Sequence, residues 1–265
     1  MEEQGNMSFL QHLEELRWRL VRAAAAIIIA GIVIWCYQEK IIDLIFLSMS
    51  KKDFITFRLF CEYFNVCITE IPIKFQSSTV SGQFSYALMM SLMGGIVITF
   101  PYLFFQLWSF VKPGLKFKEK KMARGIVFYV SLLFFLGILF GYFIVAPLSI
   151  QFFGSYQMSS KIENIFTVNS YMSTILSTVF YCGIFFLLPI MSYLLTKIGL
   201  FDSAFLIKYR KHAIVVILIL AAIITPPDVI SQVIVSIPII ILYEIGILVS
   251  KRVEKQHIKE ERPKK

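Results

Sequence analysis

The sequence alternates long apolar blocks with short polar segments. An α-helix rises about 1.5 Å per residue, so a block of about 18 or more residues can cross the ~30 Å hydrocarbon core of a bilayer. The apolar blocks occupy residues 20–37, 86–105, 125–147, 172–196, 212–224 and 230–250. The pattern therefore predicts six transmembrane helices in a single membrane domain that covers residues 1–265.

The last two predicted helices differ from the first four. Residues 212–224 would reach only about 20 Å as a helix, which is less than the hydrocarbon thickness. Pro226 and Pro227 then mark a turn at residues 225–229, because neither proline donates a backbone hydrogen bond and each restricts the residue before it. We expect both helices of this final pair to be too short for ordinary spans.

Composition favours a membrane protein over a soluble one. Hydrophobic residues make up 57% of the 265 residues and charged residues only 16%, with a mean hydropathy of +0.74. A soluble domain would carry roughly 25% charged residues. The fold class that follows is an all-α integral membrane protein.

The charges orient the predicted helices. Lys and Arg outnumber acidic residues in residues 106–124, 197–211 and 251–265, whereas the two signs balance in residues 38–85 and 148–171. Loops rich in Lys and Arg stay in the cytoplasm. We therefore expect the first 19 residues, the two basic loops and the tail in the cytoplasm, and the balanced loops and the proline turn in the periplasm. We attribute the basic charge to this topology and to anionic lipid, with no nucleic-acid partner.

No catalytic constellation is visible. Three histidines, His12, His212 and His257, lie at predicted cytoplasmic borders, and neither the phosphate-binding G-x-x-x-x-G-K-[ST] loop nor the zinc-binding H-E-x-x-H pair occurs. Paired acids at membrane depth, a metal set and a nucleophile with a base are also missing. We therefore expect no enzyme activity, no metal and no cofactor.

Glu244 is the one clear charge inside a predicted helix. An acid at this depth either extends toward the cytoplasmic border and pairs with a nearby Arg or Lys, or makes a functional polar contact. The sequence leaves both interpretations open.

The stretch before the first block predicts an amphipathic helix at the membrane interface. Its polar face carries Glu15 close to Arg17 and Arg19, either as an internally paired surface or as a binding site. The apolar positions of its other face, at helical spacing, are Phe9, Leu13, Leu16 and Leu20.

A second cluster runs from Phe104 to Glu119. Pro113 and Gly114 turn the chain there, next to aromatic residues typical of a membrane interface. Glu119 is the only acid in a run of six cations, so it either offsets its neighbours or serves as a local binding group.

Together these clusters resemble the TatC family, the multispanning receptor of the twin-arginine protein translocase. The resemblance covers residues 8–252, nearly the whole chain. It rests on four motifs in the right order: His12-Leu13-x-Glu15-Leu16-Arg17-x-Arg19, Phe110-x-x-Pro113-Gly114-Leu115-x-x-x-Glu119, Thr225-Pro226-Pro227-Asp228-x-x-Ser231-Gln232, and Pro238 to Glu244.

The resemblance implies a function that composition does not. TatC proteins bind the twin-arginine signal peptides of folded precursors at the cytoplasmic face. They work with single-span TatA and TatB-type subunits and use the protonmotive force. For this chain the resemblance further implies a cup-shaped bundle, self-association, and a place in a bacterial plasma (inner) membrane.

Roles for individual residues follow from the same resemblance. Glu15 and Glu119 are expected to hold the two signal arginines, because a carboxylate can accept the rigid guanidinium fork through both oxygens. The residues expected to complete this site are Phe110, Leu115, Arg17 and Arg19. Structural or partner contacts are expected at Pro113, Gly114, Pro226, Pro227, Asp228, Gln232 and Glu244.

Two local features qualify the resemblance. Many relatives carry Glu or Gln at the position of Leu187, two residues before a proline, so no polar contact is expected there. The stretch from Phe54 to Cys61, with Cys67 six residues later, resembles TatC proteins of the Bacteroidetes. In an oxidising periplasm Cys61 and Cys67 would form a disulfide, and otherwise they are two buried free thiols.

The main alternative function is a secondary transporter or channel for a small solute. Such proteins usually place ionisable or helix-breaking groups near the midplane and often show repeated halves. Here the first three and last three blocks share no evident repeat, and the acids gather at one surface. A purely structural scaffold would leave the four motifs without an explanation.

Overall fold

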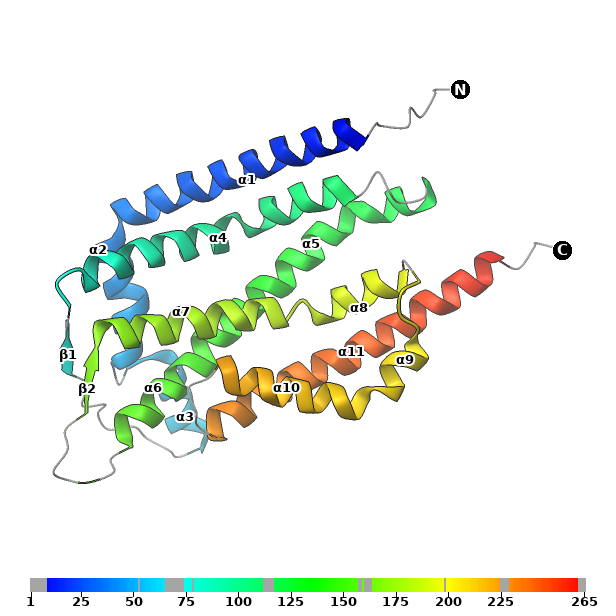
Figure 1. The fold of residues 1–265 in the computed structure, drawn as a ribbon. Helices are drawn as coiled ribbons and strands as arrows, with labels where there is room; N and C mark the ends of the chain where they lie inside the picture. The colour runs from blue at the N-terminus through cyan, green and yellow to red at the C-terminus, as the bar shows by residue number, and fades with distance from the viewer. Residues whose placement is uncertain are drawn as a thin grey trace. The chain divides into compact units, whose positions relative to one another are not determined.

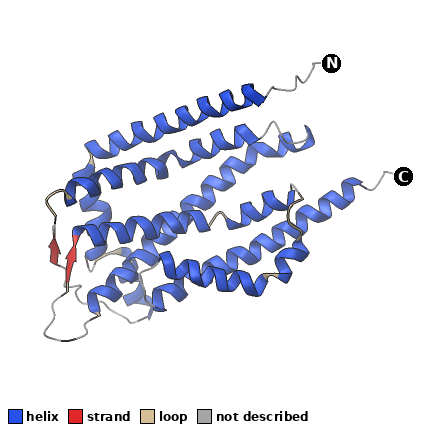
Figure 2. Ribbon diagram, viewed as in Figure 1, coloured by secondary structure: helices blue, strands red, loops and turns tan. Residues whose placement is uncertain are grey.

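The computed structural model describes residues 9–51, 53–64, 74–77, 79–111, 117–156, 159, 164–197, 199–224 and 229–261, and most of these residues are helical (Figure 1, Figure 2). Two compact units emerge from the packing: Met1–Ile41 with Phe84–Leu132, and Ile42–Gln83 with Leu133–Lys265. The helical stretches that are long and apolar enough to cross a membrane are His12–Cys36, Gly82–Phe110, Gly125–Ser155, Val168–Lys197 and Gln232–Lys255.

The first unit is built on two long helices, α1 (Phe9–Cys36) and α4 (Gly82–Val111), which run side by side in opposite directions (Figure 1). They approach most closely around Gly31 and Gly95, where a Cβ atom on Gly95 would lie 2.8 Å from the backbone oxygen of Ile27. Lipid is as apolar as a helix surface, so membrane helices associate through such close packing of small residues. The short α2 (Gln38–Ile41) follows α1.

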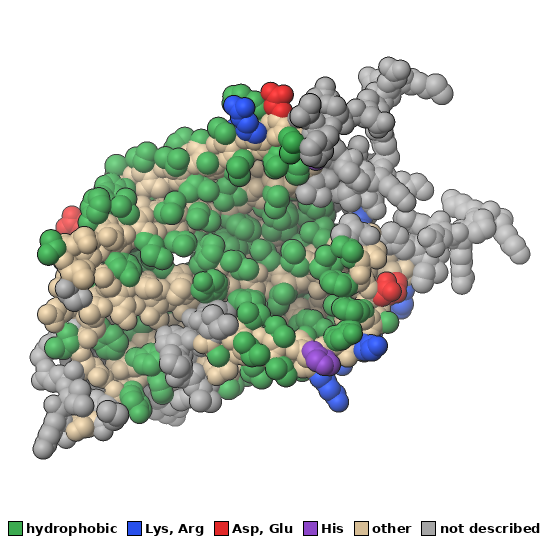
Figure 3. Space-filling model, viewed as in Figure 1, with side chains coloured by type: hydrophobic (Ala, Val, Ile, Leu, Met, Phe, Trp, Pro, Cys, Tyr) green, Lys and Arg blue, Asp and Glu red, His purple; other side chains and the backbone are tan. Residues whose placement is uncertain are grey.

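Much of the apolar surface of α1 is exposed. Leu20 and Ile29 are 68% and 64% exposed, and only 6% of the most apolar stretch of this helix is buried. Monomeric soluble proteins avoid apolar patches of this extent, so this surface fits contact with lipid or with another membrane helix. Figure 3 shows one face of the molecule, on which hydrophobic side chains cover the helices and the visible charged groups lie toward the helix ends.

The second unit contains the end of α5 (Phe117–Phe140), from Leu133, and the helices that follow it. Along the chain, α5 is followed by a π-helical turn at Gly141–Val145 and then by α6 (Ala146–Ser155). The helices that follow are α7 (Val168–Phe185), α8 (Leu188–Lys197), α9 (Ser203–Lys208), α10 (Arg210–Ile224) and α11 (Val229–Glu261). Its buried core joins the π-helical turn, α7, α10 and α11 through Val145, Cys182, Ile217, Ala221, Val235 and Ile239.

Glycines also allow a close helix crossing in the second unit. Gly137 and Gly141 are four residues apart, so they share one face of the α5 path. A Cβ atom on Gly137 would lie 2.6 Å from the backbone oxygen of Cys182, and one on Gly141 would lie 2.9 Å from Cα of Val179. Side chains at these two positions would therefore push α5 and α7 apart.

The block at residues 172–196 forms two helices instead of one. The chain breaks at Phe186 and Leu187, between α7 and α8. Pro189 explains the break, because its nitrogen has no hydrogen to donate and its ring crowds the carbonyl four residues earlier. Leu187 stays within the hydrogen-bonded path, since its backbone oxygen accepts from Ile190 and Met191.

The final pair of helices corrects one expectation. α10 has 15 residues and is short, as expected. α11 has 33 residues, and its apolar stretch Gln232–Lys255 is long enough to span a membrane. This helix continues past the apolar block because residues 251–261 are rich in Lys, Glu, Gln and Arg, which favour helices, and contain neither Gly nor Pro.

Two short strands join the segments that were expected on the periplasmic side. β1 (Lys74–Gln76) follows α3 (Ile55–Phe64) and pairs in parallel with β2 (Ile165–Thr167), in the register Lys74 to Ile165 (Figure 2). Tyr171 reinforces this connection, since its hydroxyl donates to the backbone oxygen of Phe46 at 2.6 Å. The sequence did not predict these strands.

Candidate functional site

An ion pair lies on the polar face of α1. Glu15 and Arg19 are four residues apart, so one turn of the helix brings their side chains together. Arg19 Nε donates to Oε1 of Glu15 at 3.0 Å, and Arg19 Nη2 donates to the same oxygen. Both side chains are partly buried, with 19% of Arg19 and 25% of Glu15 exposed.

The other carboxylate oxygen of Glu15 has no such partner. Oε2 is buried and accepts no hydrogen bond from any residue that the structure describes. Leaving a buried acceptor without a donor costs about 1–3 kcal/mol, and more when the group is charged. This oxygen is therefore a place where a further donor would be stabilised.

Two polar residues of α4 complete the surroundings of the ion pair. Nη1 of Arg19 lies 3.5 Å from Oε1 of Gln106, and Nε2 of Gln106 donates to the hydroxyl of Tyr102 at 2.6 Å. Gln106 is only 5% exposed. A polar chain thus runs from Glu15 through Arg19 and Gln106 to Tyr102.

An aromatic contact joins the same two helices. The rings of His12 and Phe110 are stacked, with centroids 4.3 Å apart and an angle of 15° between their planes. His12 lies three residues before Glu15, so the two side chains share a face of α1. The structure thus brings four of the residues in the first two sequence motifs, His12, Glu15, Arg19 and Phe110, to one end of the α1–α4 pair.

Arg17 does not join this cluster. It lies two positions from both Glu15 and Arg19, which places it about 200° around the helix from each of them. Its side chain is exposed, and its guanidinium carbon is 6.0 Å from the ring centroid of Trp18.

Several predicted site residues lie outside the described part of the structure. The backbone of Glu119 belongs to α5, but its side chain is outside the described residues. The other predicted residues outside the description are Pro113, Gly114, Leu115, Pro226, Pro227, Asp228 and Cys67.

A second Glu–Arg pair lies in the other unit. Arg210, the first residue of α10, directs Nε to Oε1 of Glu244 at 2.8 Å and Nη2 to Oε2 at 2.9 Å. Both carboxylate oxygens are therefore occupied by one guanidinium fork. Gln232 also ties α11 to α10, since its Nε2 donates to the backbone oxygen of Leu218 at 3.0 Å.

The cysteines fall into two groups. Cys36 and Cys182 are free thiols, and Cys61 in α3 is disulfide-bonded. Cys67 is the partner that the sequence analysis suggests for Cys61, and this pairing stays a prediction.

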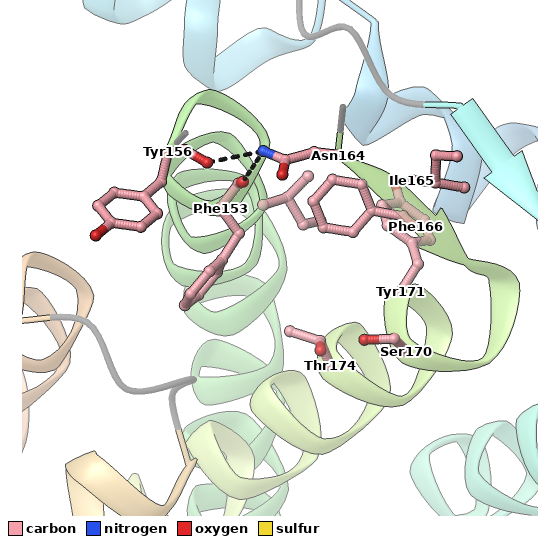
Figure 4. Close-up of a pocket in the computed structure, with 9 residues that line it drawn as sticks. Phe153, Tyr156, Asn164, Ile165, Phe166, Ser170, Tyr171 and Thr174 are labelled. Atoms are coloured by element: carbon pink, nitrogen blue, oxygen red, sulfur yellow. Dashed lines mark hydrogen bonds between the residues drawn. The ribbon is translucent and has the colours of Figure 1, made fainter. Parts of the chain in front are cut away.

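A cavity of about 530 Å³ opens between α6, β2 and the start of α7 (Figure 4). Its lining contains no charged side chain, and Asn164 at its edge donates to the backbone oxygens of Tyr156 and Phe153. None of the predicted site residues lines it. The lining residues are Ile150, Phe153, Tyr156, Asn164, Ile165, Phe166, Ser170, Tyr171 and Thr174.

Sequence reasoning missed Gln106, Tyr102 and Arg210. Tyr102 lies in the second apolar block and Gln106 directly follows that block, four residues later, and polar groups in or beside apolar blocks usually find partners in the same protein. That spacing was the signal that would have revealed them. Arg210 was counted only as one of several loop cations.

The chain is similar to known proteins along most of its length. Residues 11–238 match the family model described as Sec-independent protein translocase protein (TatC). The Sec-independent protein translocase protein TatC of Blattabacterium sp. subsp. Periplaneta americana (strain BPLAN) is 40% identical over 262 residues, which cover 96% of this chain and 98% of that protein. The TatC of Helicobacter pylori (strain J99) is 36% identical over 242 residues, with 91% and 88% covered.

A solved structure has the same fold. The crystal structure of the twin-arginine translocase receptor TatC superposes with a TM-score of 0.71 at 30% sequence identity. The match covers 92% of this chain and 99% of that one.

Proposed function

The chain belongs to the TatC family, and from that premise we propose that Glu15 of α1 binds an arginine of the twin-arginine signal peptide. As a member of this family it is a multi-pass membrane protein of the bacterial Tat system, a translocase receptor and a non-enzymatic transport component.

One observation carries the proposal for Glu15. Its Oε2 is buried and accepts no hydrogen bond from the described residues, while Oε1 is held by Arg19. A signal arginine offers five N–H donors in a planar fork, and a partly buried carboxylate strengthens the charge-assisted bond. Lysine offers a compact point charge instead, so it would fit this oxygen less well.

Glu119 is proposed as the acid for the second signal arginine. It is the only acid within the basic segment that follows α4. Phe110 and Leu115 would shape the apolar side of the site, with Phe110 held by its stack on His12. Arg17, exposed on another face of α1, would support binding only from outside this cluster.

The remaining proposals concern topology and partners. Both termini lie in the cytoplasm, and the protonmotive force drives a complex formed with TatA- and TatB-type single-span subunits and further copies of the chain.

Glu244 is a structural contact through Arg210. Partner contacts are proposed at the turn and helix start formed by Pro226, Pro227, Asp228 and Gln232, and structural contacts at Pro113 and Gly114. A Cys61–Cys67 disulfide is proposed for the periplasmic side.

The test for Glu15 is photocrosslinking of a twin-arginine precursor to membranes that contain the full chain. Glu15→Gln removes the charge at nearly constant volume, and truncating one side of a buried charge pair costs about 2–5 kcal/mol. We expect the crosslink to fall at least about 30-fold, which is the lower end of that range.

Glu14→Gln is the matched control, because Glu14 is the exposed neighbour of Glu15 on the same helix. It should leave the crosslink unchanged. A precursor with two lysines in place of its arginines should crosslink weakly to every variant. Equal crosslinking by the parent chain and Glu15→Gln would overturn the proposal.

A further inference from the structure

We propose that Gln106 and Tyr102 are positioning residues that hold Arg19 on one oxygen of Glu15 and so leave the other oxygen unpaired for a signal arginine. The inference rests on the proposed function of Glu15. It concerns two residues of α4 to which the sequence analysis assigned no role.

Arg19 does not contact Glu15 in the common geometry of an arginine–carboxylate pair. A guanidinium commonly presents two parallel N–H groups to the two oxygens of a carboxylate. Here Nε and Nη2 of Arg19 both point at Oε1 of Glu15, and Oε2 receives neither of them. The guanidinium of Arg19 therefore lies to one side of the Glu15 carboxylate.

Gln106 lies where it can maintain this displacement. Its Oε1 is 3.5 Å from Nη1 of Arg19, the nitrogen that does not contact Glu15. The guanidinium is thus shared between Glu15 on its own helix and Gln106 on α4. Moving Arg19 across to cover both oxygens of Glu15 would break its contact with Gln106.

Arg19 sets which end of the Gln106 amide faces it, because a guanidinium has only donors and a tyrosine hydroxyl can pair with either end. Nε2 of Gln106 donates to the Tyr102 hydroxyl at 2.6 Å, and this leaves the amide oxygen to face the guanidinium. Gln106 is 5% exposed, so reversing its amide would bury an unpaired donor and set N–H groups against N–H groups. The Tyr102 hydroxyl satisfies the amide NH2 group and so holds the Gln106 side chain in place while its oxygen faces Arg19.

This arrangement gives the two oxygens of Glu15 different roles. Arg19 pairs with Oε1, which reduces the free-energy cost of placing a charged carboxylate in a partly buried position. Oε2 remains unpaired until an external guanidinium reaches it. Without Gln106, Arg19 would pair with both oxygens and occupy the place of the signal arginine.

The experiment measures the dissociation constant, Kd, of a labelled synthetic twin-arginine signal peptide for the full chain in lipid nanodiscs. Gln106→Met keeps the length and removes both polar atoms, and we expect Kd to rise about tenfold, the equivalent of one charge-assisted hydrogen bond. Gln106→Glu gives Arg19 a stronger partner away from Glu15, so Kd should stay at the parent value or fall. Tyr102→Phe should raise Kd by about twofold to threefold, because the amide NH2 group loses its partner while the contact with Arg19 remains.

The different responses expected of the Met and Glu variants separate positioning from a structural role. If Gln106 only joins α1 to α4, Met and Glu at this position should both weaken binding in proportion to their loss of thermal stability. That outcome, or an unchanged Kd for Gln106→Met, would overturn the inference. Gln83→Met, at an exposed glutamine of the same helix, is the control and should leave Kd unchanged.

Glu15→Gln in the same assay separates this inference from the proposed function. Loss of binding in Glu15→Gln with no change in Gln106→Met refutes only the positioning role. Unchanged binding in Glu15→Gln refutes the recognition site itself, whatever the Gln106 variants show.

Discussion

Among the residues that the structure describes, two Glu–Arg pairs lie on helices, and they use their carboxylates differently. Glu244 has both oxygens occupied by Arg210, at 2.8 and 2.9 Å. Glu15 receives two donors from Arg19 on Oε1 alone, while Oε2 is buried without a partner among the described residues. A saturated pair connects two helices, whereas an unsaturated one keeps the capacity to bind another donor.

The difference follows from where each arginine is attached. Arg19 lies one turn after Glu15 on the same helix, so it reaches the carboxylate from one side. Arg210 begins another helix, α10, and it presents its fork to both oxygens of Glu244 on α11. Residue types alone do not distinguish the two pairs. The direction from which the cation approaches does.

Exchanging the charges is the strongest test of this comparison. Arg210→Glu combined with Glu244→Arg rebuilds the pair between the same two helices, so precursor crosslinking should stay within about twofold, as expected for a partly exposed pair. Glu15→Arg combined with Arg19→Glu places a cation where the signal arginine would bind, and crosslinking should fall at least about 100-fold. Similar losses in both exchanges would contradict the comparison.

Glycine contacts on α4, which packs beside the helix of Glu15, and on α11, which carries Glu244, give the next test. Gly95→Ala places a Cβ atom 2.8 Å from a backbone oxygen of α1, which cannot move aside, and it should destabilise the first unit by about 1–3 kcal/mol. Gly246→Ala, near Glu244, meets mainly the Oγ atom of Ser192, which can rotate away. Thermal unfolding of the full chain should therefore show a clearly larger drop in Tm for Gly95→Ala. Equal drops would mean that the α1–α4 contact is looser than described.

Shortening the acid sharpens the comparison at the recognition site. Glu15→Asp keeps the charge but withdraws the carboxylate by one methylene, so both the Arg19 contact and the position of Oε2 change. We expect the Kd of a twin-arginine peptide to rise about tenfold, or about 1.4 kcal/mol. A Kd equal to that of the parent chain would show that charge alone, without position, determines binding.

The smallest effect is expected at the saturated pair. Glu244→Gln removes an ion pair whose side chains are 45% exposed for Arg210 and 40% exposed for Glu244. Because exposed pairs contribute little, the loss of stability should be about 1 kcal/mol or less. The signal-peptide Kd should not change, and a large rise in that Kd would place Glu244 in recognition as well.

The apolar blocks predicted most of the long helices, because block length and bilayer thickness are directly related. The break before Pro189 could also have been read from the sequence, since proline limits the helix around it. The strands β1 and β2 could not, because each has three residues and their pairing joins segments about ninety positions apart. The length of α11 was underestimated because its charged end was counted as a tail, although its residues favour helix.

The residues of the candidate site were likewise predicted only in part from the sequence. Glu15, Arg19 and Phe110 were predicted from motifs, and the structure groups them with His12 at one end of the α1–α4 pair. Gln106 and Tyr102 were missed, because a glutamine near the end of an apolar helix resembles any other interfacial polar residue. Arg17 was predicted with Arg19, but helical geometry places it on another face.

The sequence by itself determined that this chain is a helical membrane protein, where its apolar helices lie, and which family its motifs resemble. These properties depend on local composition and on residue order, which folding does not alter. Only the tertiary structure decided which carboxylate oxygen is occupied and which is left unpaired. That depends on which helices meet, and they meet where glycines such as Gly95 and Gly137 let two backbones approach.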